Sequence, residues 1–87
     1  MNLLSSFKKV FIMGIGGSGM SSIAKYLKQK GHNVEGYDQR ISYITNLLES
    51  DGVKTFQNLD DFKYQKDVLY IISSAINLED TFLANYY

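Results

Sequence analysis

The chain has 87 residues with nine basic and nine acidic side chains, so its net charge is zero and its length allows one domain, residues 1–87. The balanced charge argues against general binding to nucleic acid or to an anionic membrane, which needs a basic excess. The absence of cysteine excludes disulfides and thiolate sites, and no apolar run approaches the roughly 20 residues of a membrane span, so we expect a cytoplasmic globular domain.

Two strand–helix units are predicted in the first half of the chain. Residues 8–13 form a short apolar run that ends at a glycine, which is typical of a buried strand. Residues 18–30 place apolar side chains on one helical face, and Gly31 ends this helix. Residues 32–37 then predict a second strand.

The second half continues the alternation of strands and helices. Apolar residues with helical spacing predict a helix from near Ile41 to Gly52, followed by a short strand at residues 53–56. Residues 58–65 are ambiguous, and the apolar run at residues 68–73 predicts a central strand. Asn77 is expected to cap a last helix with Asp80 in its first turn. This helix would carry Leu78, Phe82, Leu83 and Tyr86.

This order of elements predicts a Rossmann-like α/β fold, a doubly wound parallel sheet with strand order 3-2-1-4. About four strands are expected, whereas a full doubly wound half usually has another. We therefore expect a truncated sheet, cut from a longer protein or completed by self-association. A homodimer through the open sheet edge is one form of that expectation.

A glycine loop joins the first strand to the first helix. Residues 14–19 (Gly-Ile-Gly-Gly-Ser-Gly) match G-x-G-x-x-G, a pattern that holds a pyrophosphate at a helix start. Gly14 is expected to permit a tight turn, Gly16 to let an anion approach, and Gly19 to let the helix pack on the strand. Hydroxyl donors are available at Ser18 and Ser21. The alternative is a turn that serves packing alone, and no Lys-Ser or Lys-Thr follows to make an ATP-hydrolysing Walker loop.

Asp38 follows the second strand, 19 residues after Gly19, where an acid binds a ribose diol in dinucleotide-binding folds. Its competing role is an N-cap for the helix near Ile41. Arg40 is close by and is either a phosphate contact or a solvated surface charge. Glycine loop and Asp38 together serve NAD in an oxidoreductase or redox regulator, or equally a UDP-sugar, and the fold does not decide. A third possibility is a structural domain whose loop binds nothing.

Three sequence blocks resemble the muramyl ligases of peptidoglycan synthesis. Residues 11–21 (Phe-Ile-Met-Gly-Ile-Gly-Gly-Ser-Gly-Met-Ser) are similar to the opening of that family. Residues 31–34 (Gly-His-Asn-Val) with 36–38 (Gly-Tyr-Asp) resemble its second block, and residues 73–76 (Ser-Ser-Ala-Ile) its third. Tyr37 stands where the family usually has serine, and Asn58 where it often has histidine. The blocks occur in the family's order and span residues 8 to about 79.

The resemblance implies that this domain binds the UDP part of UDP-N-acetylmuramate, or of its peptide derivative, for an ATP-dependent amide-forming ligase. The diphosphate would lie against Gly16 to Met20, Asp38 near the uridine, and Ser74 to Ile76 along the cleft at the strand ends. The implied binding residues are Gly14, Gly16, Gly17, Ser18, Gly19, Met20, Ser21, Asp38, Ser73, Ser74, Ala75 and Ile76, the last four of which also fit a plain strand-to-helix turn. The family's central ATPase domain, its C-terminal domain, ATP and Mg²⁺ are needed for ligation. We therefore expect this chain alone to bind and not to catalyse, with no cofactor of its own.

Overall fold

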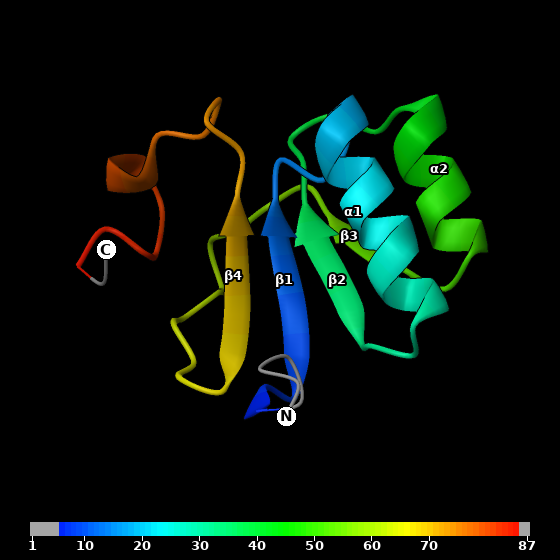
Figure 1. Ribbon diagram of the computed structural model, residues 1–87. Helices are drawn as coiled ribbons and strands as arrows, with labels where there is room; N and C mark the ends of the chain where they lie inside the picture. Colours follow the sequence, from blue (N-terminus) through cyan, green and yellow to red (C-terminus); the bar gives the residue numbers. More distant parts are fainter. Residues whose placement is uncertain (1–5, 86–87) are drawn as a thin grey trace.

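The computed structural model describes residues 6–85 and contains one four-stranded, all-parallel sheet in the order β3-β2-β1-β4 (Figure 1). The predicted α/β class, Rossmann-like arrangement and strand order are confirmed. In chain order the elements are β1 (Lys9–Met13), α1 (Ser18–Gln29), β2 (Val34–Tyr37), α2 (Tyr43–Ser50), β3 (Lys54–Phe56), β4 (Val68–Ile72) and the 3-10 turn η2 (Leu78–Asp80). Neither α-helix in the described part has the length and apolar character of a membrane span.

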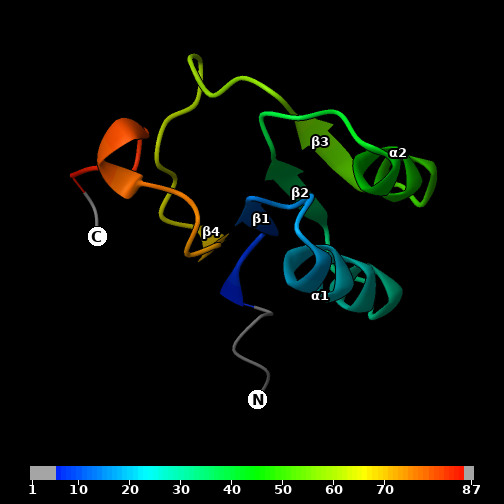
Figure 2. The ribbon, with the colours of Figure 1, turned by 90° about the horizontal axis from the view of Figure 1, so that it is seen from above.

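β1 lies inside the sheet and is covered on both faces. Val10 and Ile12 face the helices, and Phe11 and Met13 face the other side, because successive side chains of a strand point to opposite faces. Figure 2 shows α1 and α2 on one face and the segment 57–67 on the other. Burying each large apolar side chain contributes about 1.5–3 kcal/mol, so this strand anchors the loop that follows it.

β4 was expected to be central, but it lies at an edge of the sheet. Among the described residues it pairs with β1 alone. Its apolar sequence reflects coverage of its two faces, since Leu69 and Ile71 pack on the helix side and Tyr70 and Ile72 on the other. The Ser73 N–H donates to the Met13 carbonyl at 3.0 Å, so every second residue from Ser73 back along β4 points its backbone groups toward β1. The backbone groups of Tyr70 and Ile72 therefore point the other way, toward the open edge of the sheet. Self-association through this edge stays a prediction. A measurement of the mass in solution by light scattering tests it.

An aromatic cluster covers the sheet face that lacks helices. Phe62 places its ring 5.2 Å from the Phe11 ring and 5.0 Å from the Phe56 ring, measured between centroids. Phe82 adds a second layer, with its ring 5.8 Å from that of Phe62 and 5.7 Å from that of Tyr70. The segment 57–67, ambiguous in sequence, therefore forms turns without a helix and contributes Phe62 to this cover.

The prediction of a last helix was wrong within the described residues, and Tyr86 lies outside them. Asn77 does act as a cap, because its side chain accepts a hydrogen bond from the Glu79 N–H, but only the single turn η2 follows. Thr81 then adopts an extended conformation, and its hydroxyl oxygen accepts from the Leu83 N–H. This bond turns the chain so that Leu83 is buried against the sheet instead of continuing a helix.

Candidate functional site

The loop after β1 makes the tight turn expected of Gly14. Gly14 has φ +83°, a conformation that L side chains rarely adopt. Its N–H and that of Ile15 both donate to the Tyr37 carbonyl, at 2.7 and 2.9 Å, and the Gly17 N–H donates to the Gly14 carbonyl at 3.1 Å. The loop is therefore fastened to the end of β2 as well as to β1.

The close packing at Gly36 was not predicted from the sequence. A Cβ there would lie 2.5 Å from the Ile12 carbonyl oxygen and 2.5 Å from Cδ1 of Ile15. The Ile15 side chain, which follows the tight turn, thus packs against bare backbone in β2 and is fully buried. Glycine in the middle of a strand was the available signal, since it often marks a close approach.

Asp38 occupies the space that Gly16 leaves open. A Cβ at Gly16 would lie 2.8 Å from Oδ2 of Asp38, and the Gly16 N–H donates to that same oxygen at 3.0 Å. The N-cap role for Asp38 was wrong, because Ser42 caps α2 with a reciprocal pair of bonds to Thr45. A ribose contact by Asp38 stays a prediction.

The start of α1 leaves its first backbone N–H groups without a side-chain cap. Gly17 is the N-cap residue, and no side chain of residues 6–85 caps the helix start. Since the first four N–H groups of a helix lack intrahelical partners, those of Ser18, Gly19 and Met20 are available to an anion. A Cβ at Gly19 would meet no atom within 4 Å, so the packing role expected for this glycine was wrong.

Two side chains of this helix start are engaged elsewhere. The Ser21 hydroxyl donates to the Ser18 carbonyl at 3.0 Å, and Ser21 is buried. The Met20 side chain packs against the helix-side core. Ser21 and Met20 therefore support the loop through their side chains, and Met20 offers a ligand only its N–H.

Residues 73–76 form a turn beside the glycine loop. The Ile76 N–H donates to the Ser73 carbonyl at 3.0 Å, and the Ala75 N–H donates to the Ser73 hydroxyl oxygen at 3.2 Å. A Cβ at Gly14 would lie 2.8 Å from that of Ser73, so the two loops are in direct contact. The turn expected as the alternative exists, and it also brings two of the sequence blocks together.

A pocket of about 330 Å³ opens between these loops at the carboxyl ends of the strands. It lies where β1 and β4 are neighbours and their following segments leave toward opposite faces of the sheet (Figures 1 and 2). Open α/β sheets bind ligands at such a switch point. The lining includes the predicted Gly14, Gly17, Asp38, Ser73, Ala75 and Ile76, together with Tyr37, Gln39 and Arg40. Gly16, Ser18, Gly19, Met20, Ser21 and Ser74 do not line it.

A larger pocket of about 590 Å³ adjoins the first, since the two share Tyr37, Gln39, Ala75 and Ile76. Its remaining lining residues follow β3 and β4 in the chain: Gln57, Asn58, Leu59, Asp60, Asn77, Asp80 and Thr81. Most of these residues were not predicted from the sequence, although their place just after strands was a usable signal. Both departures from the muramyl-ligase pattern, at Tyr37 and Asn58, lie in this joined cleft.

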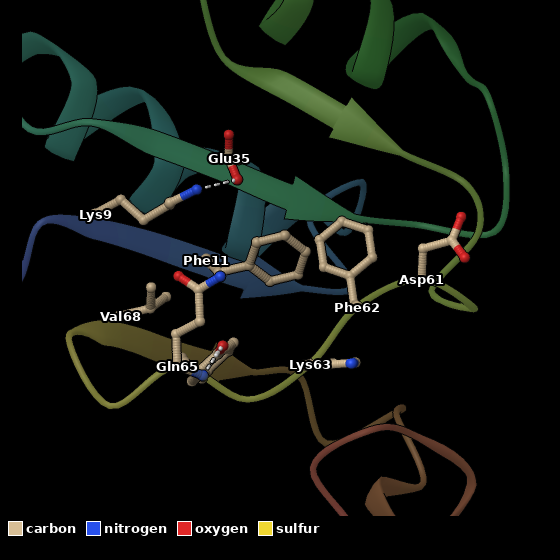
Figure 3. Close-up of a pocket in the computed structure, with 9 residues that line it drawn as sticks. Lys9, Phe11, Glu35, Asp61, Phe62, Lys63, Gln65 and Val68 are labelled. Atoms are coloured by element: carbon tan, nitrogen blue, oxygen red, sulfur yellow. Dashed lines mark hydrogen bonds and ion pairs between the residues drawn. The ribbon is translucent and has the colours of Figure 1, made fainter.

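A third pocket, of about 310 Å³, lies on the sheet face without helices and differs in character (Figure 3). Lys9 and Glu35 form an ion pair at 2.9 Å on its wall, with side chains only 24% and 18% exposed. The Tyr70 oxygen accepts from the Gln65 N–H, and burial raises the pKa of Tyr70 above its usual range. No predicted site residue lines this pocket, which does not touch the carboxyl ends of the strands.

The cleft at the strand ends is thus lined by the glycine turn and the polar strand-end loops and lies beside the open start of α1, an arrangement typical of ligand clefts in open α/β sheets. Within residues 6–85, no group of three or more His, Cys, Asp or Glu side chains is placed to hold a metal ion. The model of the Mur ligase family, catalytic domain, matches residues 9–85. The chain belongs to the Mur ligase family, which confirms the resemblance.

Curated relatives agree with this assignment. The chain is similar to UDP-N-acetylmuramate--L-alanine ligase of Christiangramia forsetii, at 31% identity over 99% of this chain and 18% of the relative. It is also similar to the ligases of the same name from Caldicellulosiruptor saccharolyticus (40% identity, 78% of this chain, 15% of the relative) and Rickettsia felis (41%, 86% and 17%). The chain spans less than a fifth of the length of these relatives.

Proposed function

We propose that this domain binds the UDP part of UDP-N-acetylmuramate, or of its peptide derivative, as the substrate-binding part of an amide-forming ligase of peptidoglycan synthesis. The observation that carries the proposal is the shared pocket of the glycine loop and residues 73–76. Two blocks that characterise the family in sequence, about 60 residues apart by the printed sequence, line one cleft at the switch point of the sheet. The names of the similar ligases supply the substrate.

The diphosphate would lie against the N–H groups at the start of α1, and the residues named for binding keep this assignment as part of the proposal. Gly17 and Gly14 present backbone to the pocket, and Gly19 leaves open space beside the free N–H groups. Ser73, Ala75 and Ile76 would form the opposite wall, with Asp38 between the two. Backbone N–H donors and a helix start can hold an anion in a protein that has no excess of positive charge, which suits this chain of zero net charge.

Ligation itself is proposed to need parts that lie outside these 87 residues. In such a ligase ATP phosphorylates the substrate carboxylate, and an amino-acid amine then displaces phosphate from the acyl phosphate. The sequence contains no G-x-x-x-x-G-K-[ST] loop to hold ATP. ATP and Mg²⁺ therefore belong to the proposed whole ligase, as does a cytoplasmic location, and the domain contributes substrate binding.

Calorimetric titration of the 87-residue chain with UDP-N-acetylmuramate, UDP and NAD tests the proposal. Binding of UDP-N-acetylmuramate and UDP, with NAD bound more weakly or not at all, is the expected result. Tight binding of NAD alone would favour the dinucleotide-binding alternative. Amide formation from UDP-N-acetylmuramate, alanine and ATP by the chain alone would contradict the non-catalytic part.

A further inference from the structure

The charges that line the joined cleft are unevenly distributed. Asp38 and Arg40 line the smaller pocket, and Asp60 and Asp80 line the larger one. Among the described residues that line either pocket, Arg40 is the only cation, against three carboxylates. A ligand with a diphosphate is repelled by these carboxylates, and the larger pocket offers it no compensating positive charge.

Asp38 holds Arg40 at the pocket without neutralising its side chain. Oδ1 of Asp38 accepts from the backbone N–H of Arg40 at 3.0 Å, while Oδ2 accepts from the Gly16 N–H at 3.0 Å. The Asp38 carboxylate thus joins the glycine loop to the loop after β2, and in both bonds its partner is a backbone N–H group. The salt bridges of the described residues are Lys8–Asp67 and Lys9–Glu35, and neither involves Arg40.

The Arg40 side chain therefore brings a full positive charge to the pocket. A guanidinium carries five N–H donors in a planar fork that matches phosphate oxygens, and it stays charged at every physiological pH. Gly17, the residue directly before the free N–H groups at the start of α1, lines the same pocket. Anion-binding groups from two loops therefore lie at or beside the smaller pocket.

We propose that Arg40 makes this cleft select a nucleoside diphosphate over the uncharged nucleoside, and that it fixes the direction in which the ligand lies. This inference rests on the proposed function. The diphosphate occupies the smaller pocket, between Arg40 and the glycine loop. The uncharged ring system then faces the side chains of the larger pocket, whose amides donate and accept hydrogen bonds and whose carboxylates accept them.

The test compares UDP with uridine by calorimetry on the whole 87-residue chain and on two variants. Arg40→Gln removes the charge but keeps the N–H that bonds to Asp38, so the fold is retained. Lys25→Gln is the matched control, because it removes the same charge from α1 at a residue that does not line the cleft. Circular dichroism melting of each variant verifies folding.

We expect Arg40→Gln to weaken UDP binding about 10-fold at low salt, the loss of one charge-assisted contact at an exposed site, and to change uridine binding less than about 2-fold. The loss shrinks at high salt because exposed charges are screened. Lys25→Gln should leave both ligands unchanged. Unchanged UDP binding by Arg40→Gln, or an equal loss for UDP and uridine, overturns the inference while leaving the proposed function standing. Failure of the unmodified chain to bind either ligand removes the proposed function, and the inference with it.

Discussion

Gly19→Ala is expected to change stability and ligand binding in opposite directions. Gly19 is the second residue of α1, and an added Cβ meets no atom within 4 Å. Replacing glycine by alanine at a compatible position restricts the unfolded chain and stabilises the fold by about 0.4–1 kcal/mol. In a domain of this size the gain raises the melting temperature by about 2–8 °C.

The same methyl group enters the space beside the free N–H groups where the diphosphate is proposed to lie. Displacing one charge-assisted hydrogen bond should weaken UDP binding about 10-fold or more. Thermal melting by circular dichroism gives the stability, and calorimetric titration with UDP gives the affinity. A variant that binds UDP as well as the unmodified chain would refute the placement of the ligand, and a lower melting temperature would refute the open space at Gly19.

Three further substitutions test the packing and electrostatics that hold the site. Gly36→Ala is expected to lower the free energy of unfolding, measured by urea denaturation, by about 2–4 kcal/mol, because the added Cβ overlaps the backbone oxygen of Ile12 and that backbone must move. A loss below about 1 kcal/mol would contradict the close approach. Phe62→Ala should cost about 2–3 kcal/mol, less than a fully buried phenylalanine because Phe62 is half-buried, and unchanged stability would show that the aromatic cover does not form. The backbone N–H and hydroxyl of Thr55 donate to the Glu49 carboxylate and lower its pKa, so the stability that Glu49 contributes is present above the unfolded pKa and is lost as pH falls through the lower folded pKa. The stability difference between Glu49→Gln and the unmodified chain should therefore vanish in acid. A difference that does not depend on pH would show that these hydrogen bonds are not its cause.

Local signals in the sequence were sufficient for the loop at the centre of the site. The glycine spacing after an apolar run placed the tight turn at Gly14, and its positive φ confirms that reading. The contact between Gly16 and Asp38 was not predictable in the same way. It depends on the pairing of β1 with β2, which sets Met13 beside Tyr37 and so brings residues 22 positions apart within hydrogen-bond distance.

The errors came from places where tertiary structure outweighs local preference. Asn77 carries a genuine cap signal, yet Thr81 and the burial of Leu83 end the helix after one turn. The apolar run of β4 was interpreted as a central position, although it records only that both faces are covered. Arg40 was recognised as a neighbour of the site, but nothing local distinguishes a pocket-lining arginine from a solvated one.

The most direct test of the central claim is a map of backbone amide shifts in the labelled domain, recorded with UDP-N-acetylmuramate and separately with NAD. The proposed function predicts shifts at residues 16–20 and 74–76 with the UDP-sugar, and smaller or no shifts there with NAD. Shifts of the same residues with NAD alone, or UDP-sugar shifts confined to the pocket around Lys9 and Glu35, would contradict it.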